Sequence, residues 1–598
     1  MTGSESEILD CPHGSRCGGC AFLGIAYSEQ LTRKHAFVQR AMARYPALAK
    51  LQLAAVADAR PTVAYRTRAK LVFGGDGALG LFERDSHTVV DIPECRVLSP
   101  VLARVVAAAR RTLSGKTPAL DGLDVRLVDD GVLVTLIAPQ GTPVTELQRL
   151  AQALRAASTD VRSVAASFRE AGAATVLGTG HVLLSGDEVS VHHLLEKGPY
   201  HLATHGAFTQ AHLGQANAAH ARIEQALTEL GAQRVLELYA GSGALALRLA
   251  AAGFAVTAIE AFGPALLHVE RAAREQKLAL RTINGQAERA LRELDARHER
   301  FQALIVNPPR RGLSPEVRRR ASALAPDAIV YMSCDPATLA RDLSHLSELG
   351  YAAERLWPFD MIPHSAAVEC LVAVHRGARP APTVLHENEH WLAVLKSGYE
   401  PVGPEPGFEH SLLDRVRTLP GASKAVALPA QRLDQDSSGV CLFARTEAAL
   451  PALDLAFRSG TQSFVALCRG VTHKRGRIRR PVREGGRVIS ASTRYLREAV
   501  QSGHSLLTIW PEQATPPQLR QLLIGVGHPV LGDARFGDLA SNTYFEHRHG
   551  LDRSFLHCSS VTLVGADFHV TCEAPLPGEL LAVRTGLGPL AEQTASPG

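Results

Sequence analysis

Three short motifs between residues 307 and 370 combine residue types that can carry out covalent chemistry. They are Asn307-Pro-Pro-Arg-Arg-Gly312, Ser333-Cys-Asp-Pro-Ala-Thr338 and Asp360-Met-Ile-Pro-His, the last leading to Glu369-Cys370. Each would lie at the carboxyl end of a parallel strand, where α/β active sites form. Cys334 stands just before an expected helix, whose dipole favours a thiolate. A lone cysteine is more often a small core residue, but the three motifs in this order favour a nucleophile.

A second chemical feature is a cluster of cysteines. Cys11, Cys17 and Cys20 form Cys-x5-Cys-Gly-Gly-Cys, and Cys95 follows in Asp-Ile-Pro-Glu-Cys. Close thiolates repel one another unless a metal neutralises them, and four suit either tetrahedral zinc or a [4Fe–4S] cluster. A zinc ribbon usually has two Cys-x2-Cys pairs and this chain has one, so the cluster is modestly favoured. The alternative of unconnected buried cysteines fits the tight triplet poorly.

A third feature is the glycine turn in Val235-Leu-Glu-Leu-Tyr-Ala-Gly-Ser-Gly243. Glycines allow a ligand to approach the backbone closely at the start of a helix. Glu260 ends the next expected strand, where a carboxylate can bind both hydroxyls of a ribose. Ala246 breaks the full dinucleotide-binding pattern, so a merely structural turn is the alternative. The position of Glu260 favours a cofactor that carries adenosine.

The elements that would position these residues alternate between short apolar strands and helices. Such alternation from about residue 199 indicates a parallel α/β sheet. The 598 residues are too many for one core, so we expect several domains and a multidomain α/β and α+β fold. The expected parts are a cysteine-rich iron–sulfur segment (1–60), a central β-rich domain (61–198), a Rossmann-like core (199–375) and, after a polar linker, an α+β domain (383–590).

The composition narrows the class of protein. A net charge of +5 permits a polyanionic partner without requiring one. Acidic residues near the start argue against a signal peptide, and charges and glycines interrupt the most apolar region, which argues against a membrane span. Ten cysteines are too sparse for a disulfide scaffold in a chain of this length. We therefore expect a cytoplasmic protein.

Residues 9–375 resemble the RNA uracil-5 methyltransferase family. The resemblance rests on the cysteine motif with Cys95, on Tyr65-Arg-Thr-Arg-Ala-Lys, on Phe208-Thr-Gln and on the three motifs above. Many relatives begin with an additional RNA-binding barrel, whereas the cysteines begin here at residue 11. The chain is therefore most similar to the short, RlmC-type branch, which acts on a uridine of large-subunit rRNA and also has Asn at the position of Asn307.

The resemblance implies a role for each matched residue. Cys334 would be the nucleophile that adds to C6 of uracil, and Glu369 the general base that removes the C5 proton. The base must leave its stack, which suits single-stranded RNA; rRNA is favoured over tRNA. Gln286 departs from the acidic group that relatives often place near adenine. The implied S-adenosylmethionine site is Gln210, Tyr239, Glu260 and Asn307, and the implied [4Fe–4S] ligands are Cys11, Cys17, Cys20 and Cys95.

Residues from about 383 resemble the RluA-type pseudouridine synthases, through Gln431-Arg-Leu-Asp-Gln-Asp-Ser-Ser-Gly439 and later motifs. The family implies that Asp434 is the essential catalytic residue, Arg520 its ion-pair partner, and Phe464 the ring that stacks on uracil in place of the usual Tyr. Gln431 and Thr515-Pro-Pro517 depart from the pattern, so an inactive RNA-binding module is the alternative. Phosphate contact is expected for the basic residues Lys474, Arg475, Arg477, Arg479, Arg480, Arg483 and Arg487.

Overall fold

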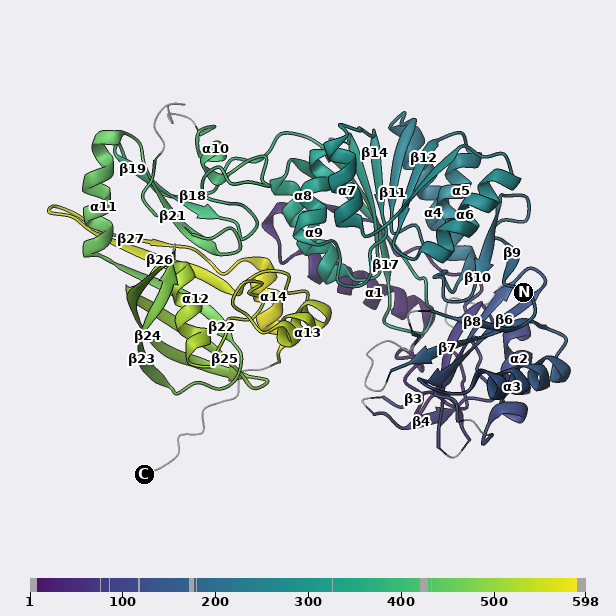
Figure 1. Cartoon of the computed structure of the whole chain (residues 1–598). Helices are drawn as coiled ribbons and strands as arrows, with labels where there is room; N and C mark the ends of the chain where they lie inside the picture. The colour runs from purple at the N-terminus through teal and green to yellow at the C-terminus, as the bar shows by residue number, and fades with distance from the viewer. Residues whose placement is uncertain are drawn as a thin grey trace, which may run out of the picture.

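The computed structural model describes residues 8–75, 77–84, 86–116, 119–170, 177–178, 180–324, 326–419, 428–431, 433–484 and 486–588. Figure 1 shows three sheet-based parts: a blue domain, a teal core and a green-to-yellow domain. Among the described residues no helix is both long and apolar enough to cross a bilayer. Arg432 of the expected Arg-Leu-Asp motif and the last ten residues lie outside the described ranges.

The core is an eight-stranded sheet in the order β1-β16-β17-β15-β14-β11-β12-β13. Parallel pairing joins β11 to both β12 and β14, and β17 runs antiparallel to β15 and β16. The expected strands at Val235, Ala255, Ala303 and Ile329 are all confirmed. The strand bounds are β1 Gln52–Leu53, β11 Arg234–Leu238, β12 Ala255–Glu260, β13 Leu280–Asn284, β14 Ala303–Val306, β15 Ala328–Ser333, β16 Tyr351–Phe359 and β17 Glu369–Arg376.

Helices cover both faces of this sheet because its strands are apolar on both sides. One face packs against α1 (Tyr27–Met42), η1 (Pro46–Leu48), α7 (Ala287–Ala296), α8 (Pro315–Ala323) and α9 (Pro336–Glu348). The other packs against α4 (Leu213–Glu229), α5 (Ala244–Ala251) and α6 (Gly263–Glu275). The expected segment 1–60 is therefore divided, since α1 and β1 belong to the core sheet and its covering layer.

The central domain is a seven-stranded sheet in the order β4-β3-β2-β5-β6-β7-β8, and its core includes residues of α2 and α3. The hairpin of β9 and β10 follows it and leads into the core. The bounds are β2 Arg68–Phe73, β3 Leu79–Phe82, β4 Val89–Asp91, α2 Pro100–Leu113, β5 Gly122–Val128, β6 Gly131–Pro139, α3 Val144–Ala157, β7 Val161–Arg169, β8 Val182–Ser185, β9 Val189–His193 and β10 Tyr200–Thr204.

The C-terminal domain is built on a ten-stranded sheet whose main path is β18-β19-β21-β26-β22-β25-β24-β23, with β20 and β27 paired beside it. Its bounds are β18 Val384–Glu387, β19 Trp391–Lys396, α10 Leu412–Val416, β20 Leu428–Pro429, β21 Ser438–Ala444, η2 Glu447–Ala449, α11 Leu450–Ser459, β22 Thr461–Cys468, β23 Arg475–Glu484, β24 Arg487–Gln501, β25 His504–Gln513, α12 Pro516–Gly525, α13 Leu539–His549, β26 Leu556–Val564, β27 His569–Glu573 and α14 Gly578–Gly586.

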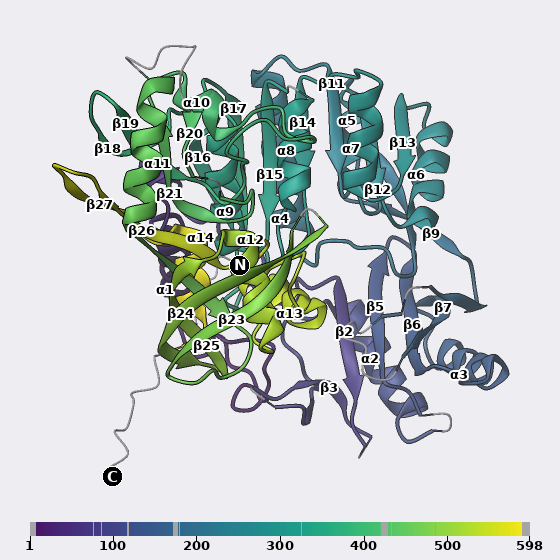
Figure 2. The ribbon, with the colours of Figure 1, turned by 60° about the vertical axis from the view of Figure 1, so that its left-hand side comes forward.

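Buried charges join the C-terminal domain to the core. Asp552 lies between Arg318 of α8 (2.6 Å) and Arg341 of α9 (3.4 Å), and it accepts a hydrogen bond from the Tyr399 hydroxyl at 2.8 Å. Both arginines also contact Asp342. Buried guanidinium groups need such partners to remain ionised. In Figures 1 and 2, α13 and α14 accordingly lie close to the core.

Candidate functional site: two side-chain pairs and a cysteine cavity

The strand register brings Cys334 and Glu369 together. Ser333, the last residue of β15, pairs with Cys370 of the antiparallel strand β17. One step beyond that pair, Cys334 therefore stands opposite Glu369. Glu369 is buried and Cys334 is half-buried. A thiol and a carboxyl group that are distant in the sequence thus share one end of the sheet.

Burial is the largest influence on the pKa values of this pair. The pKa of Cys334 is raised to about 11, first by burial and then by the charge of Glu369. Burial raises the pKa of Glu369 to about 8, while Arg310 acts to lower both values. Burial therefore opposes the Cys334 thiolate that the dipole of α9 was expected to favour. Asp335 already occupies the positive end of that helix, accepting hydrogen bonds from the N–H groups of residues 337 and 338 at 2.9 and 3.0 Å.

The Asn307–Gly312 loop is held against α9 by one buried carboxylate. Asp342 accepts hydrogen bonds from the backbone N–H of Leu313 and the hydroxyl of Tyr331, both at 2.7 Å. It also pairs with Arg318, and both side chains are fully buried. Because neither group can be satisfied by water, the loop that carries Arg310 has one preferred position beside Cys334.

The N-terminal helix α1 holds the loop that leads to Glu369. Lys34 forms a fully buried ion pair with Asp360, and the hydroxyl of Tyr27 donates to the same carboxylate at 2.8 Å. Further along, the backbone N–H of His364 donates to Gln30 at 3.0 Å. The Asp360 motif thus fixes the path of the chain into β17, and with it the position of Glu369.

The expected cofactor residues gather where the order of the strands reverses. β11 lies between β12 and β14, and Leu238 pairs with both Ile259 and Val306. Tyr239, Glu260 and Asn307 each come one residue later, at the carboxyl edge where α/β sheets bind ligands. The Glu260 carboxylate accepts from the backbone N–H groups of residues 241 (2.9 Å) and 262 (2.8 Å). The glycine turn is therefore tied to the end of β12.

Gln210 lies on the segment that approaches this turn. The carbonyl oxygen of Phe208 is 3.8 Å from the place where a side chain on Gly241 would begin, and Gln210 follows it, half-buried. Below the turn lies Glu237, an acid that the sequence did not single out. It is fully buried, and burial followed by the charge of Glu260 raises its pKa to about 8.

The four cysteines of the sequence motif line a single cavity. Cys11, Cys17, Cys20 and Cys95 share it with Tyr65, and the N–H of Gly19 donates to the Cys17 sulfur at 3.4 Å. All ten cysteines of the chain are free. Within the described ranges no three metal-binding side chains already lie in coordinating positions. The convergence of four thiols on one cavity nevertheless fits a metal or cluster ligand set in number and chemistry.

The cavity of the C-terminal domain is built around Arg520. Its guanidinium is 2.7 Å from both Asp434 and Asp436 and 3.4 Å from Asp533. Asp434, Asp436 and Arg520 line the cavity together with Pro429. Burial raises the pKa of Asp434, Arg520 lowers it, and Asp436 raises it again. The expected pair of Asp434 and Arg520 is therefore formed, and Asp436 and Asp533 are partners that the sequence did not single out.

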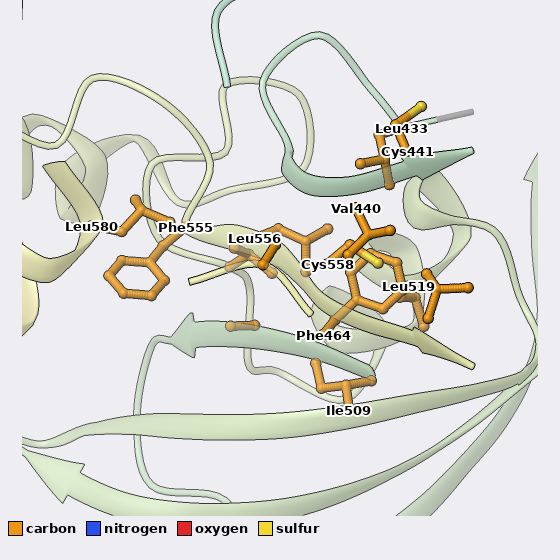
Figure 3. Close-up of a cluster of buried hydrophobic side chains, with 14 of the residues drawn as sticks. Leu433, Val440, Cys441, Phe464, Ile509, Leu519, Phe555, Leu556, Cys558 and Leu580 are labelled. Atoms are coloured by element: carbon orange, nitrogen blue, oxygen red, sulfur yellow. The ribbon is translucent and has the colours of Figure 1, made fainter. Parts of the chain in front are cut away.

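Phe464 does not present a ring to this cavity. Its side chain is fully buried in the hydrophobic core, between Val440, Ile509 and Cys558 (Figure 3), and it is absent from the described lining of the Arg520 cavity. The expected stacking role is therefore not supported by the position of Phe464. The half-buried ring of Phe536 lies nearer, 5.6 Å from the guanidinium of Arg520.

Comparison with known proteins identifies the larger part of the chain. A model of the tRNA (uracil-5-)-methyltransferase family matches residues 26–377, more than half of the 598 residues. The chain belongs to this family. At family level, its function is the S-adenosylmethionine-dependent methylation of uracil C5 in RNA. An uncharacterized RNA methyltransferase of Geobacter sulfurreducens is 31% identical to this chain. The match covers 62% of this chain and 78% of the relative.

Other similar proteins cover the two parts separately. An uncharacterized RNA methyltransferase of Gloeobacter violaceus is 28% identical over 61% of this methyltransferase and 82% of the relative. The structure of the Pyrococcus abyssi tRNA (uracil-54, C5)-methyltransferase matches with a TM-score of 0.48 and 22% identity. The match covers 60% of this chain and 84% of the Pyrococcus chain. The structure of human RNA pseudouridylate synthase domain containing 1 matches with a TM-score of 0.28 and 21% identity. The match covers 34% of this chain and 86% of the human chain.

Proposed function

We propose that this methyltransferase uses Cys334 as the nucleophile and Glu369 as the general base. The observation that carries the proposal is the strand register that sets the two residues opposite each other. The Cys334 sulfur adds to C6 of uracil, which makes C5 nucleophilic enough to be methylated. Glu369 then takes the C5 proton, and the C6–S bond breaks to release 5-methyluridine and the thiolate. S-adenosylmethionine, when bound at the edge formed by Gln210, Tyr239, Glu260 and Asn307, supplies the methyl group.

Arg310 has a defined part in this scheme. Its charge favours the ionised forms of both Cys334 and Glu369. Burial alone would leave both groups protonated at neutral pH, so the cation assists the two ionisations that the reaction needs. Arg310 is itself exposed, which leaves it accessible to the RNA.

We propose a uridine of large-subunit rRNA as the target, and a tRNA uridine as the alternative. The resemblance to the RlmC-type branch supports the first. Mass mapping of 5-methyluridine in rRNA and tRNA, from cells with and without the gene, separates the two. A 5-methyluridine that disappears from tRNA alone would rule out the rRNA assignment.

We also propose that Cys11, Cys17, Cys20 and Cys95 hold a [4Fe–4S] cluster, because these four thiols line one cavity. The cluster, when bound, would cross-link the N-terminal segment to the central domain. That segment also reaches the loop that leads to Glu369, since the backbone N–H of Phe22 donates to the carbonyl of His364 at 2.9 Å. The cluster would therefore stabilise the approach to Glu369.

For the C-terminal domain we propose isomerisation of uridine to pseudouridine by Asp434. The 2.7 Å contact between Asp434 and Arg520 at a cavity supports it, because a half-buried carboxylate with a cationic partner can ionise and attack. The basic residues between Lys474 and Arg487 are exposed on the β23–β24 hairpin, where they can contact phosphates. The competing proposal is an RNA-binding module without catalysis.

Replacement of the nucleophile tests the main proposal. Cys334→Ala should lower methylation on the order of 10³-fold or more, while binding of S-adenosylmethionine, measured by calorimetry, should stay unchanged. Cys370→Ala is the matched control, because it removes the neighbouring thiol of the same strand end. If Cys334→Ala methylates RNA at the wild-type rate, the covalent mechanism is wrong.

A further inference from the structure

A pocket at the boundary between the methyltransferase core and the C-terminal domain is lined by both of them. From the core it is lined by Arg44, Arg310 and Asp335, among others, and from the C-terminal domain by Arg548, His549 and Glu579, among others. The centres of water-sized spheres can occupy about 180 Å³ of it, whereas one bound water needs about 10–15 Å³ measured in this way. The pocket therefore has room for a phosphate group with hydration.

The pocket adjoins the methyltransferase site. Asp335 follows Cys334 directly in the chain, and the charge of Arg310 acts on both Cys334 and Glu369. Both Asp335 and Arg310 line the pocket. An RNA strand whose uridine reaches Cys334 must therefore pass close to this pocket with its neighbouring phosphates.

The last turn of α13 is fixed at this position by contacts across the boundary. The Arg341 guanidinium donates to the carbonyl oxygen of Gly550, which caps α13, at 2.6 Å. Arg311 of the Asn307–Gly312 loop lies 3.7 Å from Glu546 on α13. The buried contacts of Asp552 follow two residues after Gly550. These contacts hold the C-terminal end of α13, with its basic side chains, in a defined orientation against the Asn307–Gly312 loop.

The charge of the pocket is unbalanced toward positive. Its two acids are engaged: Asp335 caps α9, and Glu579 pairs with Arg553 at 2.6 Å. Arg44, Arg310 and Arg548 are exposed, and none of them has an ion-pair partner among the described residues. Burial lowers the pKa of His549, as do the charges of Arg548 and His504. Of the two neighbours Arg548 and His549, Arg548 is therefore the more permanent positive charge.

We infer that this pocket binds backbone phosphates of the RNA strand that carries the target uridine, so that α13 of the C-terminal domain forms part of the RNA site of the methyltransferase. The inference rests on the proposed methylation of RNA. Exposed arginines that converge from three chain segments beside a reactive residue are suited to phosphate contact, which fixes the register of a nucleic acid without reading its sequence.

Charge reversal at Arg548 in the full-length protein tests the inference. The probe is total RNA from cells that lack the gene, methylated with a tritiated donor. Arg548→Glu should raise the KM for RNA about tenfold, with little change in kcat. It should also reduce the slope of the logarithm of RNA affinity against the logarithm of salt concentration by about one, the loss of one phosphate contact. Arg458→Glu is the control, because Arg458 is an exposed helical arginine of α11 in the same domain and pairs with Asp454 of its own helix.

Two readouts keep this test separate from that of the proposed function. RNA affinity is measured by filter binding in the Cys334→Ala background, where no methylation occurs. Equal affinity and salt dependence for Arg548→Glu and wild type, at equal thermal unfolding midpoints, would overturn the inference even if methylation is real. Absence of methylation by wild type would count against the proposed function alone, because the binding difference could still be measured.

Discussion

Glu369 raises the pKa of Cys334, its neighbour across the antiparallel strands β15 and β17. An ionised Glu369 therefore opposes ionisation of the Cys334 thiol. The pair titrates as a coupled unit whose apparent pKa values belong to both groups.

Alkylation of Cys334 should report this coupling. A thiol reacts as its thiolate, so its rate rises with pH through the pKa. Glu369→Gln removes a raising charge and should shift the midpoint for iodoacetamide modification of Cys334, followed by mass spectrometry, to lower pH. Arg310→Ala removes a lowering charge and should shift it to higher pH. Shifts in the same direction for both variants would contradict the assigned signs.

Glu369→Gln should also trap a reaction intermediate. The amide cannot accept the C5 proton, so methylated uracil should stay attached to Cys334. We expect a protein–RNA adduct that survives a denaturing gel, carries tritium from the methyl donor, and is absent when Cys334→Ala is added. Rapid release of 5-methyluridine by Glu369→Gln would show that another group is the base.

Anaerobic purification should yield brown protein with about four irons per chain and equivalent sulfide. Cys17→Ser should lose iron and folded yield together, because Cys17 is the buried member of the four. Cys572→Ser, which alters a buried cysteine of the C-terminal domain, serves as the control and should keep the iron. Stoichiometric zinc without sulfide in this material would show that the four cysteines form a zinc site and not a cluster site.

Pseudouridine formation can be tested in full-length Cys334→Ala. This background cannot release tritium from uracil C5 by methylation, so release from C5-tritiated RNA reports isomerisation. We expect release that disappears in Asp434→Asn and falls strongly in Arg520→Lys, which loses the two-pronged contact with Asp434 and Asp436. RNA binding without any release would leave the binding module as the function of this domain.

The buried bridge between the domains should be costly to remove. Asp552→Asn leaves Arg318 and Arg341 with Asp342 as their remaining anion, and we expect a loss of about 3 kcal/mol in the free energy of unfolding. Asp567→Asn, at an exposed position, should have no measurable effect. Chemical denaturation followed by circular dichroism makes the comparison. Equal unfolding free energies would show that the bridge contributes little.

The sequence predicted the parts that depend on local pattern. The strands that end at Leu238, Glu260, Val306 and Ser333 are apolar runs followed by polar motifs, so their alignment at one edge follows from parallel pairing. Contacts between distant segments could not be read in this way. Arg318 and Asp552 are 234 positions apart, and no local pattern relates them.

Errors in the predicted site have the same origin. The helix dipole beside Cys334 was correctly placed, but Asp335 uses it, and burial acts in the opposite direction. Phe464 has the residue type for stacking, yet strand β22 turns its ring into the core. Residue type and position in a motif therefore predicted which groups lie together better than they predicted the surroundings of those groups.

The Asp552 bridge has a consequence for how a single RNA molecule would be handled. Because buried charges hold the two parts together, the Cys334 and Asp434 sites are a fixed distance apart. An RNA that spans both would meet the second site at a high effective concentration once it had bound the first, and such tethering can raise affinity by about 10²- to 10⁴-fold. RNAs too short or too stiff to reach both proposed sites would gain nothing, so the fixed spacing would favour longer RNA substrates.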